Sequence, residues 1–215
     1  SNFAVSTEET RYYLNGVYFH VAEEAGETVL RAVATDGHRL ARVDAPLPEG
    51  AGAAPGVIVP RKTVAELRKL LDGAEGEISV SVSETKIRFA FDGLTLTSKV
   101  IDGAFPDYTR VIPTGNDKRM DVDAKAFGRA VDRVATVSQE RSRTVKMSLE
   151  EDRLVLSVTS PESGSATEEI DVGYPDAPLE IGFNARYLSE IAEQIDRENA
   201  VFLFADPGAP TLVRE

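Results

Sequence analysis

The chain has 215 residues, of which 42% are hydrophobic and 28% charged, and it carries a formal net charge of −12 with no cysteine. This composition supports a hydrophobic core in one large or two small domains. It excludes disulfide bonds and cysteine-ligated zinc, and the lack of cysteine fits a reducing compartment. The acidic balance argues against a protein that coats nucleic acid through overall basicity, although one face can still carry a basic stripe. The longest apolar runs, such as residues 200–205, are too short to span a bilayer.

The patterns along the chain predict short strands and a few helices. Asp36-Gly37 predicts a two-residue hairpin turn, after which His38 and Arg39 open the returning strand. Residues 56–73 predict a strand followed by a helix, with Pro60 near the first turn and Gly73 after the last. Alternating hydrophobic residues predict half-buried strands at 77–82, 86–91 and 153–158. Amphipathic helices are expected at 62–71, 123–136 and 184–195. Many strands with few helices favour an α+β fold of antiparallel sheets covered by helices.

Two pairs of segments repeat in the same order along the chain. Residues 4–11 (AVSTEETR) match 136–143 (TVSQERSR), and residues 62–72 match 186–196. The repeat predicts a duplicated unit, with the boundary in the Pro- and Gly-containing stretch 112–120, and hence domains at 1–113 and 114–215. Residues 94–101 have no counterpart in the second half. The chain is therefore expected to be a fragment that begins inside a helix and ends before a final strand.

Two of the expected helices carry basic residues opposite an apolar face. The apolar faces comprise Val64, Leu67, Leu70 and Leu71 in the first helix and Phe127, Ala130, Val131 and Val134 in the second. The basic faces comprise Arg61, Lys62, Arg68 and Lys69 in the first, and Lys125, Arg129 and Arg133 in the second. A single basic helix face is usually just exposed to solvent. Two such faces at related positions in an acidic protein are as consistent with a surface that contacts phosphates as with a solvated face. The helix at 184–195 differs, because it mixes Arg186 with Glu190 and Glu193.

Catalytic motifs are scarce in this sequence. It contains no GxSxG, P-loop or GxGxxG motif, and its two histidines lack metal-ligand spacing. A small-molecule hydrolase using Asp36, His38 and Asp107 is one alternative, but it needs these side chains to converge and a nucleophile or metal that no motif supplies. A module whose basic faces meet an acidic protein is another.

Five motifs occur in order along nearly the whole chain. They are RYYLNGV (11–17), ATDGHRLA (34–41), VIVPRKTVAEL (57–67), TSKVIDGAFPDYTRVIP (97–113) and IGFNARYL (181–188). Together they closely resemble the bacterial DNA polymerase III beta subunit family, the beta sliding clamps. The resemblance implies an α+β chain of two repeated DNA-clamp (processivity-fold) domains, the second and third of three. In that fold antiparallel sheets form the outer wall, and helices line the inner face of a ring around duplex DNA.

The resemblance also implies a function and a set of partners. It implies a processivity factor, a non-catalytic subunit of the DNA polymerase III holoenzyme with no cofactor and a cytoplasmic location. The partners implied are duplex DNA, bound without sequence preference, and the polymerase III alpha subunit, the clamp loader and repair and translesion proteins, which dock through short linear peptides. No membrane partner is implied. The full-length protein is expected to form a head-to-tail homodimer, and this fragment to be a monomer or to associate in a non-native way.

Two sets of site residues follow from the resemblance. The DNA-facing set is Arg61, Lys62, Arg68, Lys69, Lys125, Arg129 and Arg133. The peptide-binding pocket, which the family builds between its second and third domains, is Leu14, Thr35, Gly37, His38, Arg39, Leu40, Pro106, Arg110 and Val111. Leu14, Leu40 and Val111 are expected to supply apolar contact, and Gly37 close approach of a peptide backbone. Arg39 and Arg110 are expected to steer acidic peptides. The resemblance implies no catalytic or metal-binding residue.

Overall fold

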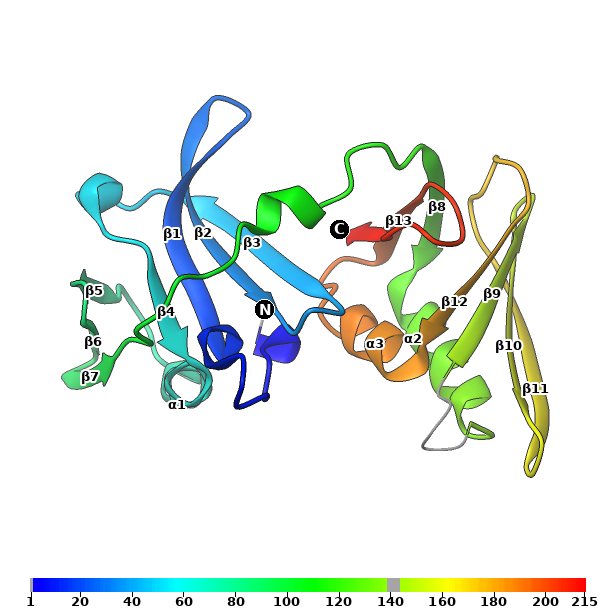
Figure 1. The fold of residues 1–215 in the computed structure, drawn as a ribbon, viewed down its shortest axis with the longest axis horizontal. Helices are drawn as coiled ribbons and strands as arrows, with labels where there is room; N and C mark the ends of the chain where they lie inside the picture. The colour runs from blue at the N-terminus through cyan, green and yellow to red at the C-terminus, as the bar shows by residue number, and fades with distance from the viewer. Residues whose placement is uncertain (1, 139–143) are drawn as a thin grey trace. The chain divides into compact units, whose positions relative to one another are not determined.

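The computed structural model describes residues 2–138 and 144–215. The chain divides into two compact units, Ser1–Pro106 (unit 1) and Asp107–Glu215 (unit 2). Each unit combines antiparallel sheets with helices (Figure 1), which confirms the predicted α+β class. No helix among the described residues is long and apolar enough to cross a membrane.

The two units contain the following elements. Those of unit 1 are η1 (Asn2–Ala4), η2 (Tyr12–Leu14), β1 (Gly16–Glu24), β2 (Glu27–Thr35), β3 (Leu40–Pro46), η3 (Ala51–Ala53), β4 (Val57–Pro60), α1 (Arg61–Leu71), β5 (Ser79–Val82), β6 (Lys86–Phe91) and β7 (Leu94–Lys99). Those of unit 2 are η4 (Tyr108–Val111), β8 (Lys118–Asp123), α2 (Ala124–Ala135), β9 (Thr144–Glu150), β10 (Arg153–Ser160), β11 (Gly164–Asp171), β12 (Leu179–Asn184), α3 (Ala185–Ala192), β13 (Asn199–Phe204) and β14 (Leu212–Arg214). The η elements are short 3₁₀ turns.

The sheet topology reveals the duplication directly. The four-stranded sheet of unit 1 has the order β3-β2-β1-β4, and that of unit 2 has the matching order β11-β10-β9-β12. In both units a helix follows the last strand of this sheet, α1 after β4 and α3 after β12. A three-stranded sheet completes each unit, β5-β6-β7 in the first and β14-β13-β8 in the second. The sequence match of 4–11 with 136–143 extends into residues 139–143, which lie outside the described residues.

Two kinds of Gly-containing loop connect neighbouring strands of unit 1. Ala25-Gly26 joins β1 to β2 with φ of 51° and 85°, and Asp92-Gly93 joins β6 to β7 with φ of 47° and 75°. Positive φ at both positions is what a two-residue hairpin turn of type I′ requires. Thr35, by contrast, pairs with Leu40, so the loop between β2 and β3 spans four residues. The predicted two-residue turn at Asp36-Gly37 is therefore wrong, because only the glycine has positive φ there.

The helices lie where the hydrophobic pattern predicts them. Gly73, at φ 80°, follows the end of α1. The Asp123 carboxylate caps α2 by accepting a hydrogen bond from the Ala126 amide at 2.6 Å. Helix α3 ends at Ala192, earlier than predicted, because the chain then tightens into i,i+3 bonds such as that from the Ile195 amide to the Ala192 carbonyl.

The apolar faces of α1 and α2 are buried to different extents. All four predicted apolar residues of α2 are at most 2% exposed, which confirms that face. On α1 the partly buried residues are Val64, Leu67 and Leu71, whereas Leu70 is 40% exposed. The prediction for Leu70 is wrong, since 100° per residue carries it away from the line through the other three. Thr63 is buried instead and hydrogen bonds through its Oγ1 to Ser98 Oγ at 2.7 Å.

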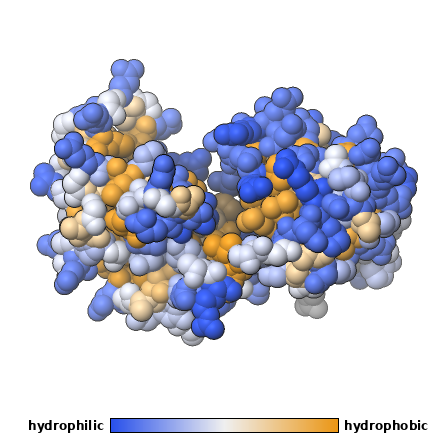
Figure 2. All heavy atoms as spheres, turned by 90° about the horizontal axis from the view of Figure 1, so that it is seen from above, coloured by the Kyte–Doolittle hydropathy of each residue, from blue (hydrophilic) through white to orange (hydrophobic). Residues whose placement is uncertain are grey.

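The hydrophobic core is distributed unequally between the units. Unit 2 has one continuous cluster that joins α2 and α3 to both sheets and includes Phe127, Tyr174 and Phe202. Unit 1 has two smaller clusters, one around Val17 and Ala34 and one around Val59 and Phe89. Figure 2 shows a largely hydrophilic surface on which hydrophobic atoms of both units remain visible.

Candidate functional site

The loop between β2 and β3, residues 36–39, is held by its own polar groups. Asp36 Oδ1 accepts hydrogen bonds from the amides of His38 at 2.9 Å and Arg39 at 3.0 Å. Thr35 Oγ1 accepts from the Gly37 amide at 3.1 Å and donates to the Arg39 carbonyl at 2.8 Å. These local bonds replace a tight turn with a wider one. The loop presents Gly37 and His38 at the surface in a defined shape.

Two arginines tie this loop to the N-terminal segment. Arg39 Nη2 donates to the Phe3 carbonyl at 2.8 Å, its guanidinium lies 5.2 Å from the centre of the Phe3 ring, and its Nε reaches Asp36 Oδ2 at 3.2 Å. The Arg39 side chain is only 10% exposed, so its charged head is engaged within unit 1.

Arg11 makes the second tie and contacts the backbone of Gly37. A β-carbon placed on Gly37 would lie 2.6 Å from Arg11 Nη1, and Arg11 Nη2 donates to the Asp36 carbonyl at 3.3 Å. Glu8 accepts two hydrogen bonds from Arg11, each of 2.8 Å, and these lower the pKa of the Glu8 carboxyl. The three-residue spacing of Glu8 and Arg11 is too common in proteins to mark a site, so this contact has no signal in the sequence.

The other pocket candidates differ in exposure and unit. Leu14 is 4% exposed, while Leu40 is half-buried. Arg110 and Val111 belong to η4 of unit 2, which begins where the Asp107 carboxylate accepts hydrogen bonds from the Thr109 amide at 3.2 Å and hydroxyl at 2.6 Å. Val111 is 61% exposed, so its aliphatic side chain is accessible on unit 2.

The basic residues divide into paired and unpaired groups. Arg61, Lys62, Arg68, Lys125 and Arg129 are exposed and have no acidic side chain within ion-pair distance among the described residues. Lys69, in contrast, lies 3.0 Å from Glu66. Arg133 Nε donates to Glu168 Oε2 of β11 at 2.8 Å, with a second contact through Nη2, and this pairing lowers the pKa of Glu168. On α3, Arg186 pairs with Glu190 at 2.7 Å, which leaves that helix without a basic stripe.

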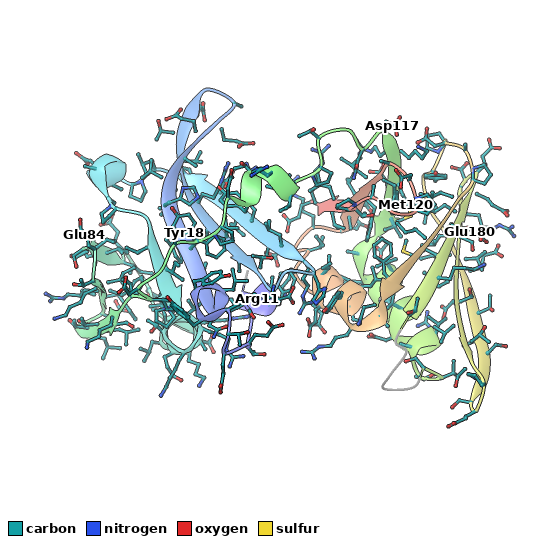
Figure 3. The ribbon with its side chains drawn as sticks, viewed as in Figure 1. Arg11, Tyr18, Glu84, Asp117, Met120 and Glu180 are labelled. Atoms are coloured by element: carbon teal, nitrogen blue, oxygen red, sulfur yellow. The ribbon has the colours of Figure 1, made fainter. Side chains whose placement is uncertain are left out.

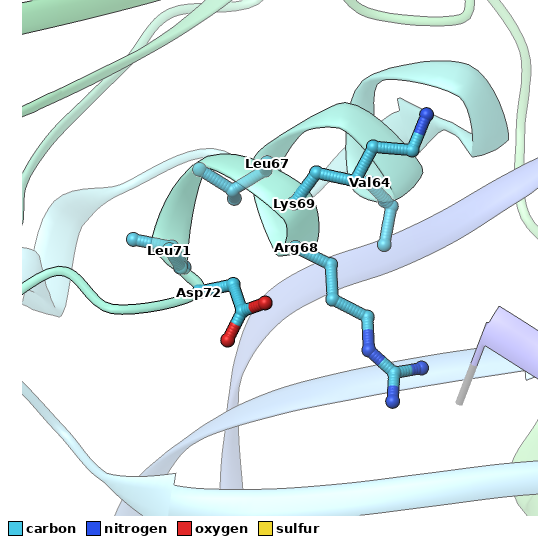
Figure 4. A pocket seen from close by; sticks show the side chains of 6 residues that line it. All are labelled: Val64, Leu67, Arg68, Lys69, Leu71 and Asp72. Atoms are coloured by element: carbon cyan, nitrogen blue, oxygen red, sulfur yellow. The ribbon is translucent and has the colours of Figure 1, made fainter.

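A shallow open hollow runs along α1 (Figure 4). Its lining residues are Val64, Leu67, Arg68, Lys69, Leu71 and Asp72. Val64, Leu67 and Leu71 are its apolar lining residues, while Arg68 and Lys69 extend away from the helix in different directions. Because half of the lining residues are apolar and the other half mix both signs of charge, the hollow does not have the chemistry of a phosphate-binding site.

The proposed hydrolase constellation has no support in this geometry. Both carboxylate oxygens of Asp36 are engaged in the loop, and Asp107 Oδ1 serves as the cap of η4. In residues 2–138 and 144–215 no three His, Asp or Glu side chains cluster as a metal site would require.

Comparison with known proteins accounts for both units. The family model described as the DNA polymerase III beta subunit, central domain, matches residues 1–107, and that of the C-terminal domain matches residues 109–215. The beta sliding clamp of Caulobacter vibrioides (strain NA1000 / CB15N) is 58% identical over 213 residues, which are 99% of this chain and 57% of that protein. The beta sliding clamp of Escherichia coli (strain K12) is 38% identical over 206 residues, 96% of this chain and 55% of that protein.

Solved structures agree with these matches. A sliding clamp from Bartonella birtlesii bound to griselimycin superposes with a TM-score of 0.95 at 51% identity, covering 100% of this chain and 58% of that one. A C. crescentus beta sliding clamp with PEG bound also gives 0.95, at 58% identity over 99% of this chain and 57% of that one. The architecture is thus that of a sliding clamp. The chain belongs to the bacterial DNA polymerase III beta subunit family and spans its central and C-terminal domains. It covers somewhat more than half the length of these relatives.

Proposed function

We propose that this chain is the two-domain part of a DNA sliding clamp, a non-catalytic processivity factor that surrounds duplex DNA and tethers replication and repair proteins. The observation that carries the proposal is that the two clamp-domain models account for residues 1–107 and 109–215 in family order. The proposed partners are duplex DNA, the polymerase III alpha subunit, the clamp loader and repair and translesion proteins. The full-length protein is proposed to act as a head-to-tail homodimer in the cytoplasm.

The DNA-facing surface is proposed to be the unpaired basic residues of α1 and α2. Arg61, Lys62, Arg68, Lys125 and Arg129 are exposed without acidic partners among the described residues, so each can approach a phosphate without first breaking an ion pair. Contacts to phosphates carry no sequence information, which suits a protein that moves along any duplex. The acidic remainder of the chain limits the overall attraction, so that DNA is surrounded without being gripped.

The peptide-docking surface is proposed to include the β2–β3 loop together with Leu14, Pro106, Arg110 and Val111. Gly37, which is exposed beside the Arg11 guanidinium, is proposed to meet the peptide backbone, and Leu14 and Leu40 are proposed to offer apolar contact. Because the Arg39 head is engaged by Phe3 and Asp36, we assign steering of acidic peptides to Arg110, which is exposed. Pro106 and Val111 are proposed to complete the apolar contact.

A fluorescence-anisotropy titration with a labelled peptide containing Gln-Leu-x-Leu-Phe tests this proposal. Saturable binding is expected, and Leu40→Asp is expected to raise Kd by more than about tenfold, because docking would strip water from the new carboxylate. Val43→Asp is the matched control, since Val43 lies on the same strand, β3, and is 54% exposed. It should change Kd by less than about twofold. An equal loss of peptide affinity in the two variants, when circular dichroism shows that both are folded, would contradict docking at this surface.

A further inference from the structure

The segment that leads from β7 towards unit 2, residues 100–106 (the connector), is stacked onto the sheet of unit 1. The ring of Phe105 lies 5.0 Å from the ring of Tyr18 with an interplanar angle of 12°. Tyr18 also stacks on His20, at 4.5 Å and 21°. Tyr18 and His20 are two residues apart on β1 and share one face of the sheet. Figure 3 labels Tyr18 on this strand, and Figure 1 shows the connector crossing β4 and β1.

Two further contacts fix the connector along its length. The Ile101 amide donates to the Ile58 carbonyl of β4 at 2.9 Å, which forms an isolated antiparallel bridge. A β-carbon on Gly103 would lie 3.1 Å from Tyr13 Cβ and 3.5 Å from the Tyr12 ring, so the connector passes closely over η2. It is thus held at its start, middle and end by three different elements of unit 1.

These anchors lie next to residues that the docking proposal uses. Phe105 directly precedes Pro106, and Tyr13 directly precedes Leu14. A stack of nearly parallel rings has a preferred geometry as well as buried area, so it restricts where the attached backbone can lie. Loss of the Phe105 ring would free Pro106 and loosen the cover over η2, while the strands beneath retain their own hydrogen bonds.

We propose that the Phe105–Tyr18 stack is a positioning device for peptide docking: Phe105 and Tyr18 act through the connector, and neither needs to touch the peptide. This inference rests on the proposed docking function. It adds two residues that the sequence motifs did not assign to the site. Residues that are already held in place bind a peptide more tightly, because no conformational freedom has to be lost from them on docking.

The test uses Phe105→Leu, which keeps apolar volume but removes the ring plane, in the same peptide titration. Phe105→Leu is expected to weaken binding about fivefold, and Phe105→Tyr to restore it to within about twofold of wild type. Tyr18→Leu is expected to weaken binding similarly. The double variant should be little weaker than either single variant, because both remove the same stack.

Phe19→Leu is the matched control, because Phe19 is the neighbouring half-buried aromatic of β1 and packs on the opposite face, against the core. It is expected to lower Tm without changing the peptide Kd, which separates positioning from general stability. A peptide Kd that is the same in wild type, Phe105→Leu and Tyr18→Leu would overturn the positioning role. Equal weakening by Phe19→Leu would also overturn it, because general stability would then explain the loss. No binding by the wild-type chain would instead overturn the docking function itself, and the positioning role with it.

Discussion

Four charged side chains form a closed network on the sheet face of unit 1 that carries Tyr18. Arg31, whose side chain is 5% exposed, donates through Nε and Nη2 to Asp44 at 2.7 and 2.8 Å. Arg42 reaches Asp44 at 2.5 Å, and both arginines also contact Glu24. Hydrogen bonds from Arg31, followed by those from Arg42, hold the pKa of Asp44 far below its usual range. The pKa of Glu24 is lowered in the same way, first by Arg42 and then by Arg31.

The network predicts an acid-sensitive contribution to the stability of unit 1. Both carboxyl pKa values are depressed by folding, so the stabilisation is complete above the unfolded carboxyl pKa of about 4 and is lost as pH falls towards the depressed values. Asp44→Asn is expected to lower the free energy of unfolding at pH 7 by about 1–3 kcal/mol, because Arg31 stays buried with one partner fewer. It should also flatten the dependence on pH below about 4. Urea denaturation followed by circular dichroism between acid and neutral pH measures both effects.

Glu180→Gln provides the comparison for that prediction. Glu180 pairs with Lys146 at 2.9 Å on the corresponding sheet of unit 2, but the two side chains are 67% and 52% exposed. Exposed pairs contribute little, so this variant is expected to leave the free energy of unfolding nearly unchanged. Parallel pH profiles for wild type and Asp44→Asn would show that the network does not couple folding to protonation.

At the scale of elements, the basic stripe of α2 is interrupted by its neighbouring strand. Arg133, at the end of the stripe, is 56% exposed but bound to Glu168 of β11. The hydrogen bonds that Arg133 donates to the Glu168 carboxylate raise the pKa of Arg133, so the arginine remains charged but its charge is compensated. A cation that must leave a carboxylate to reach a phosphate gains less from the exchange than an unpaired one such as Arg129.

Glu168→Gln is therefore expected to strengthen association with duplex DNA. Release of Arg133 should add up to about one phosphate contact and steepen the slope of log K against log salt by up to about 1. Anisotropy with a labelled duplex over a range of salt concentrations measures this slope. Glu162→Gln makes the same charge change at an exposed turn and is expected to leave the slope unaltered. An equal response to the two variants would mean that net charge, and not the release of Arg133, controls the association.

At the scale of the whole molecule, the two units have the same sheet order but unequal cores. Most of the large hydrophobic residues that remain exposed belong to unit 1, among them Ile78 at 41% and Val80 at 52% beside the short strand β5. The core of unit 1 is divided into two clusters, while that of unit 2 is continuous around α2. Burial of apolar surface is the main favourable term in folding, so duplication of the fold does not imply equal stability.

Unit 1 is accordingly expected to unfold before unit 2. Native-state hydrogen exchange should show the amides of β5 and β6 exchanging through a lower-energy opening than those of β8 and β13. Thermal unfolding should give two transitions, with the first moved by Asp44→Asn and the second left in place. A single thermal transition, together with equal opening free energies for the amides of both units in hydrogen exchange, would contradict this order. The two units would then unfold together.

Local pattern determined much of this protein. The positions of α1 and α2, the buried face of α2 and the duplication were all readable from the sequence, because helical periodicity and capping residues act over a few neighbouring positions. The five ordered motifs were enough to identify the family. They also marked residues 35–40 as a pocket segment, and that assignment together with the DNA-facing set stays a prediction.

Tertiary structure decided the features that depend on residues far apart in sequence. The sequence Asp-Gly occurs in two different loops: it forms a tight turn at 92–93 but only part of a four-residue loop at 36–39. Strand register and the hydrogen bonds of Thr35 and Asp36 set the length of the second loop. The pairing of Arg133 with Glu168 and the stacking of Phe105 on Tyr18 join segments that no local pattern connects. Side chains meet across strands only once the register of the whole sheet is set, and that register is a property of the folded unit.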